Sequence, residues 1–218
     1  MAGREPSEVV TRAGRTITVP RQPQRLSRAF YARPTLEVAA SLLGRTFYRR
    51  NTEGTVAGRV VEVEAYCGLD DPGSHAFRGM TKRNQTMFGP GGHLYVYFTY
   101  GMHHCANVVT SKHGIAGAVL LRAVEPLEGL ELMAARRGVG EPGLLAKGPG
   151  RLCQAFALTR MDDDTDLTDG DVWFSRGRRL RAPVRSSSRI GLRPEWDQPW
   201  RLFEVGPWVS GPASLNRG

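Results

Sequence analysis

Residues 93–110, HLYVYFTYGMHHCANVVT, constrain the fold of this chain more than any other stretch of its sequence. Two runs of β-branched and aromatic residues, about 93–100 and 103–110, flank Gly101 and predict an antiparallel β-hairpin. Successive strand residues point to opposite faces. One face therefore carries Tyr95, Tyr97 and Thr99, and the other carries Val96, Phe98 and Tyr100. From the residues alone, such rings favour core or hairpin packing, and each buried tyrosine then needs a partner for its hydroxyl.

The remaining patterns predict a sheet-based domain with a few helices. Alternating or Val-rich runs predict further strands, and helical spacing of apolar residues predicts helices. The expected strands are 58–66, 117–126, 171–177 and 200–206, and the expected helices are 34–44, 127–137 and 148–158. Residues 70–92 form a long polar, glycine-rich connection of the kind that is functional or disordered. We expect the α+β class, with one mixed domain around a curved antiparallel β-sheet from which the hairpin protrudes.

The amino-terminal segment differs from the rest of the chain. Residues 1–28 contain six arginines and several prolines but no periodic apolar pattern, so we expect a disordered basic arm, followed by a folded domain over residues 29–214. The whole chain has a net charge of +9, which favours an anionic partner, with nucleic acid ahead of membrane surfaces and acidic ligands. A merely basic protein is the alternative.

Several features argue against a disulfide framework, a metal site and a secreted or membrane protein. Cys67, Cys105 and Cys153 are widely spaced, which disfavours a disulfide framework and a structural zinc site. Residues 162–171, DDDTDLTDGD, resemble a calcium loop, but the glycine falls one residue late and the closing glutamate is missing. We expect no metal, no cofactor and an acidic loop turned away from DNA. Because there is no long apolar run or signal core, we expect a soluble intracellular protein, located in the cytoplasm or nucleoid if its source is a bacterium.

The strand at 58–66 carries two candidate catalytic carboxylates. Alternation places Val61, Val63 and Ala65 on the core face and Glu62, Glu64 and Tyr66 on the other face. Two carboxylates this close raise each other's pKa, and burial raises it further, so one of them could act as a general acid or base. The alternative is an ordinary solvated strand face.

Five ordered blocks of sequence resemble the alkyladenine (3-methyladenine, methylpurine) DNA glycosylase family. They are VVEVEAYCGLDDPGSHA, RNQTMFGPGGHLYVYFTYGMHHCANVV, GAVLLRAVEPLEGLE, GPGRLCQA and GPWVS, and they run from about Phe30 to Ser210. The resemblance implies a monofunctional enzyme of base excision repair. Such an enzyme flips a damaged purine out of duplex DNA and hydrolyses the N-glycosidic bond with an activated water, leaving an abasic site.

The resemblance also implies which residues carry the chemistry. The general base is the second glutamate of the E-x-E-A-Y segment, here Glu64. Arg122 of the LLRA strand lies near the water, and the backbone carbonyl of Ile190 in the RIG segment helps to hold it. A carboxylate suits this reaction, because it can deprotonate the water and stabilise the positive charge that develops on the sugar.

The same resemblance assigns the aromatic residues. Tyr66 and Tyr97 would stack on either side of the flipped base, His75 would form the pocket wall, and Asn107 would disfavour purines with a 2-amino group. Tyr100, beside the hairpin turn, would be the wedge that fills the gap in the DNA stack. Further DNA contacts near the lesion are expected from Thr81, Met87, Met102 and His103. From the residues alone, the tyrosines would be core or hairpin packing, and Asn107 could equally be a tie within the hairpin.

Two alternatives to a glycosylase follow from these residues. A non-catalytic binder of damaged DNA or RNA would keep Tyr100 and the basic surface but would not need Glu64. A nucleoside hydrolase would need neither the wedge nor the positive charge. Glu64 with Arg122 disfavours the first, and Tyr100 with the charge disfavours the second. We expect a monomer that acts on double-stranded DNA containing damaged purines, without a membrane partner.

Overall fold

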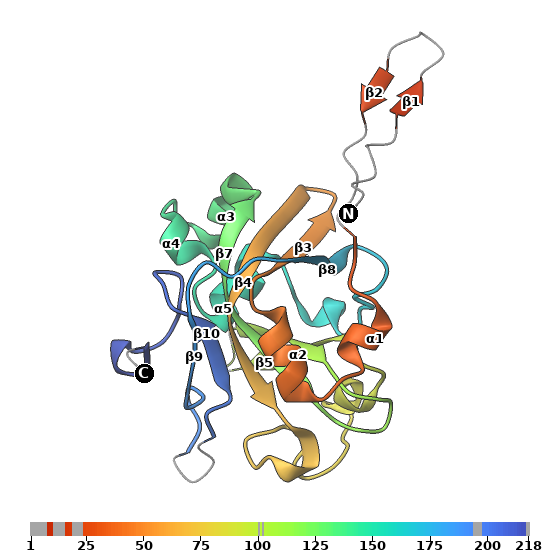
Figure 1. Cartoon of the computed structure of the whole chain (residues 1–218), viewed down its shortest axis with the longest axis vertical. Coiled ribbons are helices and arrows are strands. Elements are labelled where there is room, and N and C mark those ends of the chain that lie inside the picture. The colour runs from red at the N-terminus through yellow and green to blue at the C-terminus, as the bar shows by residue number, and fades with distance from the viewer. Residues whose placement is uncertain are drawn as a thin grey trace.

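Strand β4 (Gly54–Tyr66) is the centre of the fold in the computed structural model, which describes residues 8–10, 16–18, 24–99, 101, 103–193 and 198–216. One edge of β4 pairs antiparallel with β7 (Ala118–Glu128). The other edge is shared, because β3 (Arg45–Asn51) pairs with its first half and β10 (Arg201–Glu204) pairs with Glu62–Glu64. The sheet therefore branches along β4, as Figure 1 shows.

The remaining strands extend the sheet beyond β7 on one edge and beyond the β3 and β10 branches on the other. The hairpin of β5 (Leu94–Thr99) and β6 (His103–Val109) joins the sheet at β7, β9 (Val184–Ser187) adds to β10, and β8 (Val172–Arg178) adds to β3. Every pairing is antiparallel, and the main path runs β5-β6-β7-β4-β10-β9. The predicted α+β fold around an antiparallel sheet with a hairpin is confirmed.

A bulge in β4 lies between the segment that pairs with β3 and the segment that pairs with β10. The register against β7 shifts between Val60 and Glu62 and again between Glu62 and Val63. The extra residue, Val61, is buried, but it lies outside the main core cluster, which contains Val60 and Val63 instead. The predicted core face is therefore wrong at Val61, because a bulge inserts one residue and alternation cannot be counted through it. It holds from Glu62 to Tyr66, where the functional side chains lie.

Short helices cover the sheet. They are α1 (Arg28–Tyr31), α2 (Thr35–Leu42), α3 (Leu130–Arg137), α4 (Pro142–Leu145) and α5 (Pro149–Ala155), with 3₁₀ turns at Gly68–Asp70, Gln85–Phe88, Arg160–Asp162 and Ala213–Asn216. The helix expected over 127–137 starts later than predicted, because β7 continues to Glu128 and Gly129 turns the chain in a left-handed conformation. Strands β3 and β9 were not predicted; their sequences, RTFYRRN and VRSS, lack apolar alternation.

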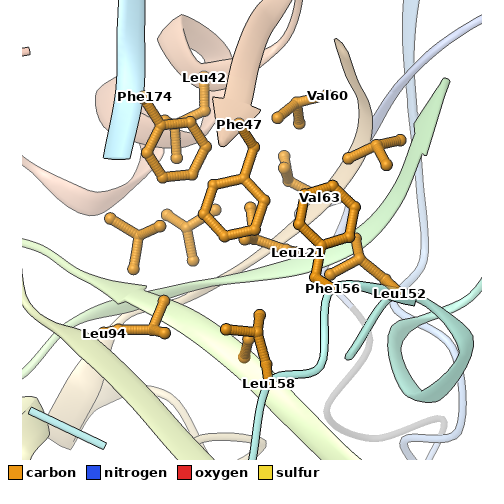
Figure 2. Packing of buried hydrophobic residues seen from close by; sticks show 14 of the residues in the cluster. Leu42, Phe47, Val60, Val63, Leu94, Leu121, Leu152, Phe156, Leu158 and Phe174 are labelled. Atoms are coloured by element: carbon orange, nitrogen blue, oxygen red, sulfur yellow. The ribbon is translucent and has the colours of Figure 1, made fainter. Parts of the chain in front are cut away.

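The core lies between the sheet and these helices. Figure 2 shows Phe47 of β3 among the rings of Phe156 and Phe174, with centroids 5.0 and 4.7 Å away. Leu42 of α2 and Leu152 of α5 pack into the same cluster and are fully buried. Burial of such side chains contributes roughly 1.5–3 kcal/mol each. Because this core packs against one face of β4 and β7, it holds the opposite, polar face of β4 in a fixed position.

The amino-terminal segment contains a pair of short strands that the sequence did not predict. These are β1 (Glu8–Val10) and β2 (Thr16–Thr18), which pair antiparallel with each other. Their β-branched residues favour extended backbone. Residues 1–7, 11–15 and 19–23 of the expected basic arm lie outside the described residues, and its disorder stays a prediction. The chain joins the domain shortly before residue 29, since Leu26 is buried.

Candidate active site

A cavity of about 240 Å³ lies where the carboxyl end of β4 meets the β5–β6 hairpin. This volume is below the roughly 300 Å³ at which pockets for drug-sized ligands begin, so the cavity suits one flat ring system. Six parts of the chain line it: β4, the hairpin, β7, the start of α5 and the two loops around residues 73–87 and 190–192. The residues from these parts are Glu64, Tyr66, Gly73, His75, Met87, Tyr95, Tyr97, Thr99, Cys105, Asn107, Ala118, Leu120, Arg122, Pro149, Ile190, Gly191 and Leu192.

Glu64 is the acidic residue of this cavity. Its side chain is fully buried, and its two oxygens have different partners. Oε1 accepts a hydrogen bond of 2.7 Å from the Ile190 backbone N–H and lies 3.2 Å from Nη1 of Arg122. Oε2 accepts a hydrogen bond of 2.9 Å from the Tyr66 hydroxyl. An ionised carboxylate has about four acceptor positions, of which these three neighbours use three.

The family resemblance assigned Ile190 to this site through its backbone carbonyl, whereas its contact with Glu64 is made by the backbone N–H. The carbonyl's role toward a water stays a prediction. Tyr66 donates to Glu64 in addition to lining the cavity with its ring. Burial, followed by the charge of Glu64, raises the pKa of Tyr66 well above its ordinary value, so its hydroxyl keeps the proton that it donates.

Glu62 points to the same face of β4 but belongs to a closed network. Oε1 accepts bonds of 2.8 Å from both Arg122 Nε and Arg201 Nε, and Oε2 accepts one of 2.6 Å from the Ser210 backbone N–H. Burial alone would raise the pKa of Glu62, but Arg122 and Arg201 outweigh it and the pKa is lowered. The expectation that the two carboxylates raise each other's pKa is therefore wrong for Glu62. The solvated-face alternative is wrong as well, because both glutamates are fully buried.

Arg122 connects the two carboxylates. Its guanidinium binds Glu62 through Nε and faces Glu64 through Nη1. Burial alone would lower the pKa of Arg122, but Glu64 and Glu62 outweigh it and the pKa is raised. Arg122 is thus a fixed positive charge between the network and the cavity.

Aromatic rings form part of the cavity wall, and Tyr95, Tyr97 and Thr99, which were predicted to share one face of the hairpin, all line the cavity. The His75 and Tyr97 rings meet edge to face with centroids 4.5 Å apart. His75 Nδ1 lies 3.1 Å from the Tyr95 hydroxyl. Burial, and then the charge of Arg83, lowers the pKa of His75, which keeps the imidazole neutral at physiological pH. Tyr95, which we did not assign to the site, is therefore part of it.

Asn107 lies on the same wall. It is buried, lines the cavity and donates from Nδ2 to the Tyr95 carbonyl at 3.1 Å. Both earlier interpretations thus have support, since the side chain ties the hairpin and also borders the cavity. Cys105 also lines the cavity, and burial raises its thiol pKa. No motif in the sequence marked Cys105, because a single cysteine without spacing carries no signal.

The predicted DNA contacts fall into different environments. Thr81 and His103 are exposed, whereas Met87 is buried and lines the cavity, so Met87 can reach a bound base but not the outside of a duplex. Tyr100 and Met102 lie outside the described residues, and their roles stay predictions. His103 lines a second hollow that adjoins the cavity and is bordered by Arg137, Lys147 and Arg151.

Asn84, for which the sequence gives no signal, organises the loop that carries His75. Asn84 is buried, and its Nδ2 donates to the carbonyls of His75 (2.7 Å) and Gly79 (3.0 Å). Its Oδ1 accepts from the Thr81 backbone N–H at 2.6 Å. Asn84 thereby holds the loop that carries His75. An asparagine in a polar loop gives no sequence signal, because only the fold shows which backbone groups surround it.

Comparison with known proteins matches this arrangement to one family. The family model described as methylpurine-DNA glycosylase matches residues 29–207. The chain belongs to the methylpurine-DNA glycosylase family. Relatives named "Putative 3-methyladenine DNA glycosylase" include one from Streptomyces avermitilis, 56% identical with 85% of this chain and 90% of the relative covered. Another from Chlorobaculum tepidum is 45% identical, with 89% and 96% covered.

Membership of this family makes the protein a hydrolase of N-glycosyl bonds with DNA as its substrate, in DNA repair by base excision. The resemblance seen in the five sequence blocks is confirmed. Among the described residues, no helix has the length and hydrophobicity needed to cross a membrane.

Proposed function

We propose that this protein is a monofunctional DNA glycosylase that flips alkylated or deaminated purines, of the 3-methyladenine, hypoxanthine and ethenoadenine class, out of duplex DNA. It hydrolyses the N-glycosidic bond with an activated water and leaves an abasic site. One observation carries the proposal. A fully buried carboxylate, Glu64, lies at a cavity sized for one flat ring system and is oriented by three neighbouring donors.

The aromatic wall supports binding of an extrahelical base. Stacking on aromatic side chains is worth about 1–3 kcal/mol per base and tolerates different bases. Tyr66 and Tyr97 both line the cavity, from β4 and from the hairpin, which suits a base held between them. Neutral His75 borders the base edge, and buried Asn107 disfavours purines with a 2-amino group, as in normal guanine.

Glu64 acts as the general base. The acceptor position that its three neighbours do not use binds the water, with the Ile190 carbonyl as a second ligand of that water. As the water oxygen bonds to C1′, its proton passes to Glu64 and the electron pair of the N-glycosidic bond leaves with the purine. The charged carboxylate also stabilises the positive sugar, and Arg122 keeps Glu64 in one orientation.

The DNA itself is held by the surface around the cavity. Arg137, Lys147 and Arg151 border the adjoining hollow and suit the phosphate backbone, with Thr81 and His103 as exposed neighbours of the lesion. In this proposal Tyr100 takes the space that the flipped nucleotide leaves, and Met102 contacts the DNA near the lesion. The protein acts as a monomer.

Lyase activity is absent in this proposal. Strand cleavage through a Schiff base needs an amine at the flipped sugar. Lys147 borders the adjoining hollow rather than the cavity, and its ammonium donates to the Pro207 carbonyl at 2.9 Å. We expect no covalent protein–DNA adduct after borohydride treatment; an adduct that survives denaturation would point to Lys147.

Duplexes carrying hypoxanthine, ethenoadenine or 3-methyladenine test the proposal directly. Incubation with the protein followed by alkaline cleavage should reveal abasic sites with at least one lesion and none with undamaged DNA. The alternative is a non-catalytic binder of damaged nucleic acid. It would retain lesion-selective binding in a gel-shift assay while producing no abasic site with any of the three duplexes.

A further inference from the structure

Behind the cavity, Asp71 and Arg189 form a buried ion pair that no step above uses. Arg189 Nη1 and Nη2 donate to the two carboxylate oxygens of Asp71 at 2.6 and 2.7 Å, and both side chains are about 1% exposed. Such two-point pairing fixes the guanidinium in direction as well as in distance. The pair joins the loop after β4 to the segment that contains Ile190.

The guanidinium of Arg189 also contacts aromatic rings. The guanidinium carbon, Cζ, lies 4.7 Å from the centre of the Tyr66 ring and 5.1 Å from the centre of the Trp200 ring. Tyr66 lines the cavity but Arg189 does not. The cation therefore supports the Tyr66 ring from the side away from the bound base, and a cation over an aromatic face is attractive.

The Asp71–Arg189 pair fixes the backbone of two segments that meet at Glu64: the end of β4 and the segment that contains Ile190. Arg189 Nη1 donates to the Ala65 carbonyl at 2.9 Å, and this carbonyl belongs to the peptide unit that precedes Tyr66. The Ile190 N–H that binds Glu64 belongs to the peptide unit that follows Arg189. Because peptide units are planar, fixing Ala65 and Arg189 restricts the position of the Tyr66 ring and of the Ile190 donor together.

Asp71 extends this support to the cavity loop. Its oxygens accept hydrogen bonds from the backbone N–H groups of Cys67 (3.0 Å) and Gly73 (2.9 Å). Gly73 lines the cavity, and a methyl group on it would approach Arg189 Nη2 to 2.8 Å and Leu192 Cδ1 to 2.6 Å. The close packing of loop and guanidinium thus requires glycine at this position.

We propose that Asp71 and Arg189 are positioning residues for excision, which hold the Tyr66 ring and the Ile190 N–H in the geometry that Glu64 needs. This inference rests on the proposed function. Small displacements of catalytic groups are costly, and a misplacement of about 1 Å can lower a rate by roughly 10²-fold. The pair acts through Tyr66 and Ile190 and does not itself touch the base.

The test compares two neutralised ion pairs. Asp71→Asn with Arg189→Gln replaces the positioning pair by neutral side chains that can still hydrogen-bond. Arg59→Gln with Glu204→Gln does the same to a pair of 2.5 Å that is also buried but does not border the cavity. For each protein we would measure the melting temperature, the affinity for undamaged duplex, and the single-turnover excision rate at saturating enzyme, well below melting.

We expect the Asp71/Arg189 double variant to excise at least about 10-fold more slowly than wild type while its affinity for undamaged DNA stays within about 2-fold. The Arg59/Glu204 control should keep its rate within about 2-fold, even if its melting temperature falls. Arg189→Lys keeps the charge but not the two-point pairing, so its rate should lie between wild type and the double variant. In a Glu64→Gln background, the residual rate should not fall further.

A wild-type excision rate in the folded double variant would overturn the inference, as would an equal loss in the control. If the double variant does not fold, Arg189→Lys decides, because a wild-type rate in that variant would overturn the positioning role. Absence of excision by wild-type protein would instead contradict the proposed function, so the two failures are distinguishable.

Discussion

Glu62 and Glu64 lie two residues apart on the same face of β4, and both are fully buried, yet their surroundings differ in kind. Glu62 accepts hydrogen bonds from the guanidinium groups of Arg122 and Arg201 and from the backbone N–H and the hydroxyl of Ser210. Glu64 shares only Arg122 with that network and otherwise borders the cavity.

Under the proposed function, the difference separates a structural carboxylate from a reactive one. A carboxylate saturated by strong donors holds its neighbours in place and has little capacity to take a proton from a substrate. A carboxylate oriented by three donors at the edge of a cavity can still bind a water. Glu62 therefore fixes Arg122, and Arg122 in turn orients Glu64. Substitution of Glu62 should therefore lower mainly the stability, and substitution of Glu64 mainly the excision rate.

The largest effect is expected from Glu62→Gln on stability. Neutralising Glu62 leaves Arg122 and Arg201 buried with less compensation, and breaking a buried ion pair costs about 3–5 kcal/mol. Urea unfolding should show a loss of this size, whereas Glu64→Gln should lose clearly less. An unchanged midpoint for Glu62→Gln would remove the structural role assigned to Glu62.

A second test removes one donor from the reactive carboxylate. Tyr66→Phe keeps the stacking ring but removes the hydroxyl that binds Glu64 Oε2. Hydrogen bonds to charged groups are worth about 1.5–3 kcal/mol, so single-turnover excision should fall roughly 10- to 100-fold. Tyr95→Phe is the matched control, because its hydroxyl contacts His75 rather than Glu64. Equal losses in both variants would show that the Tyr66 bond has no special part.

Stacking should be separable from chemistry at Tyr97. Loss of one ring should weaken lesion binding by about 1–3 kcal/mol. We would measure the affinity of Tyr97→Ala for a hypoxanthine duplex in a Glu64→Gln background, which prevents turnover. Affinity for undamaged duplex should be unchanged. If damaged and undamaged duplexes weakened equally, Tyr97 would serve general DNA binding and not the base.

The smallest effect concerns acid stability. The pKa of Glu62 is lowered in the folded protein, so the unfolded chain binds its proton more readily. The stabilisation from Glu62 is therefore fully present above the unfolded pKa of about 4.3 and is lost as pH falls through the folded value. Thermal unfolding between pH 6 and pH 3 should show a shallower decline for Glu62→Gln than for wild type. Parallel curves would contradict the lowered pKa.

The sequence predicted the parts of this molecule that depend on local pattern. Strand alternation placed Tyr95 and Tyr97 on one face, and it placed Glu62, Glu64 and Tyr66 together, which the cavity confirms for Glu64, Tyr66 and both hairpin tyrosines. The family resemblance pointed to Glu64 as the base, but the structural role of Glu62 was not predictable. It depends on Arg201 and Ser210, which are about 140 residues away along the chain and meet Glu62 only in the folded sheet.

Other features were hidden for the same reason. The bulge at Val61 breaks the alternation on which the core assignment rested. Arg189 and Asp71 are unremarkable charged residues in sequence, and only the fold joins them behind Tyr66. Family resemblance gave the roles of the pocket residues but did not indicate how their backbone is held.

The single-turnover rate of Glu64→Gln tests the central claim most directly. Glutamine keeps the shape of the side chain but can neither accept the proton of the water nor offset positive charge on the sugar. We expect excision to fall by at least about 10²-fold, with the melting temperature and the affinity for lesion DNA close to wild type. A rate within about 3-fold of wild type would contradict the claim that Glu64 is the general base.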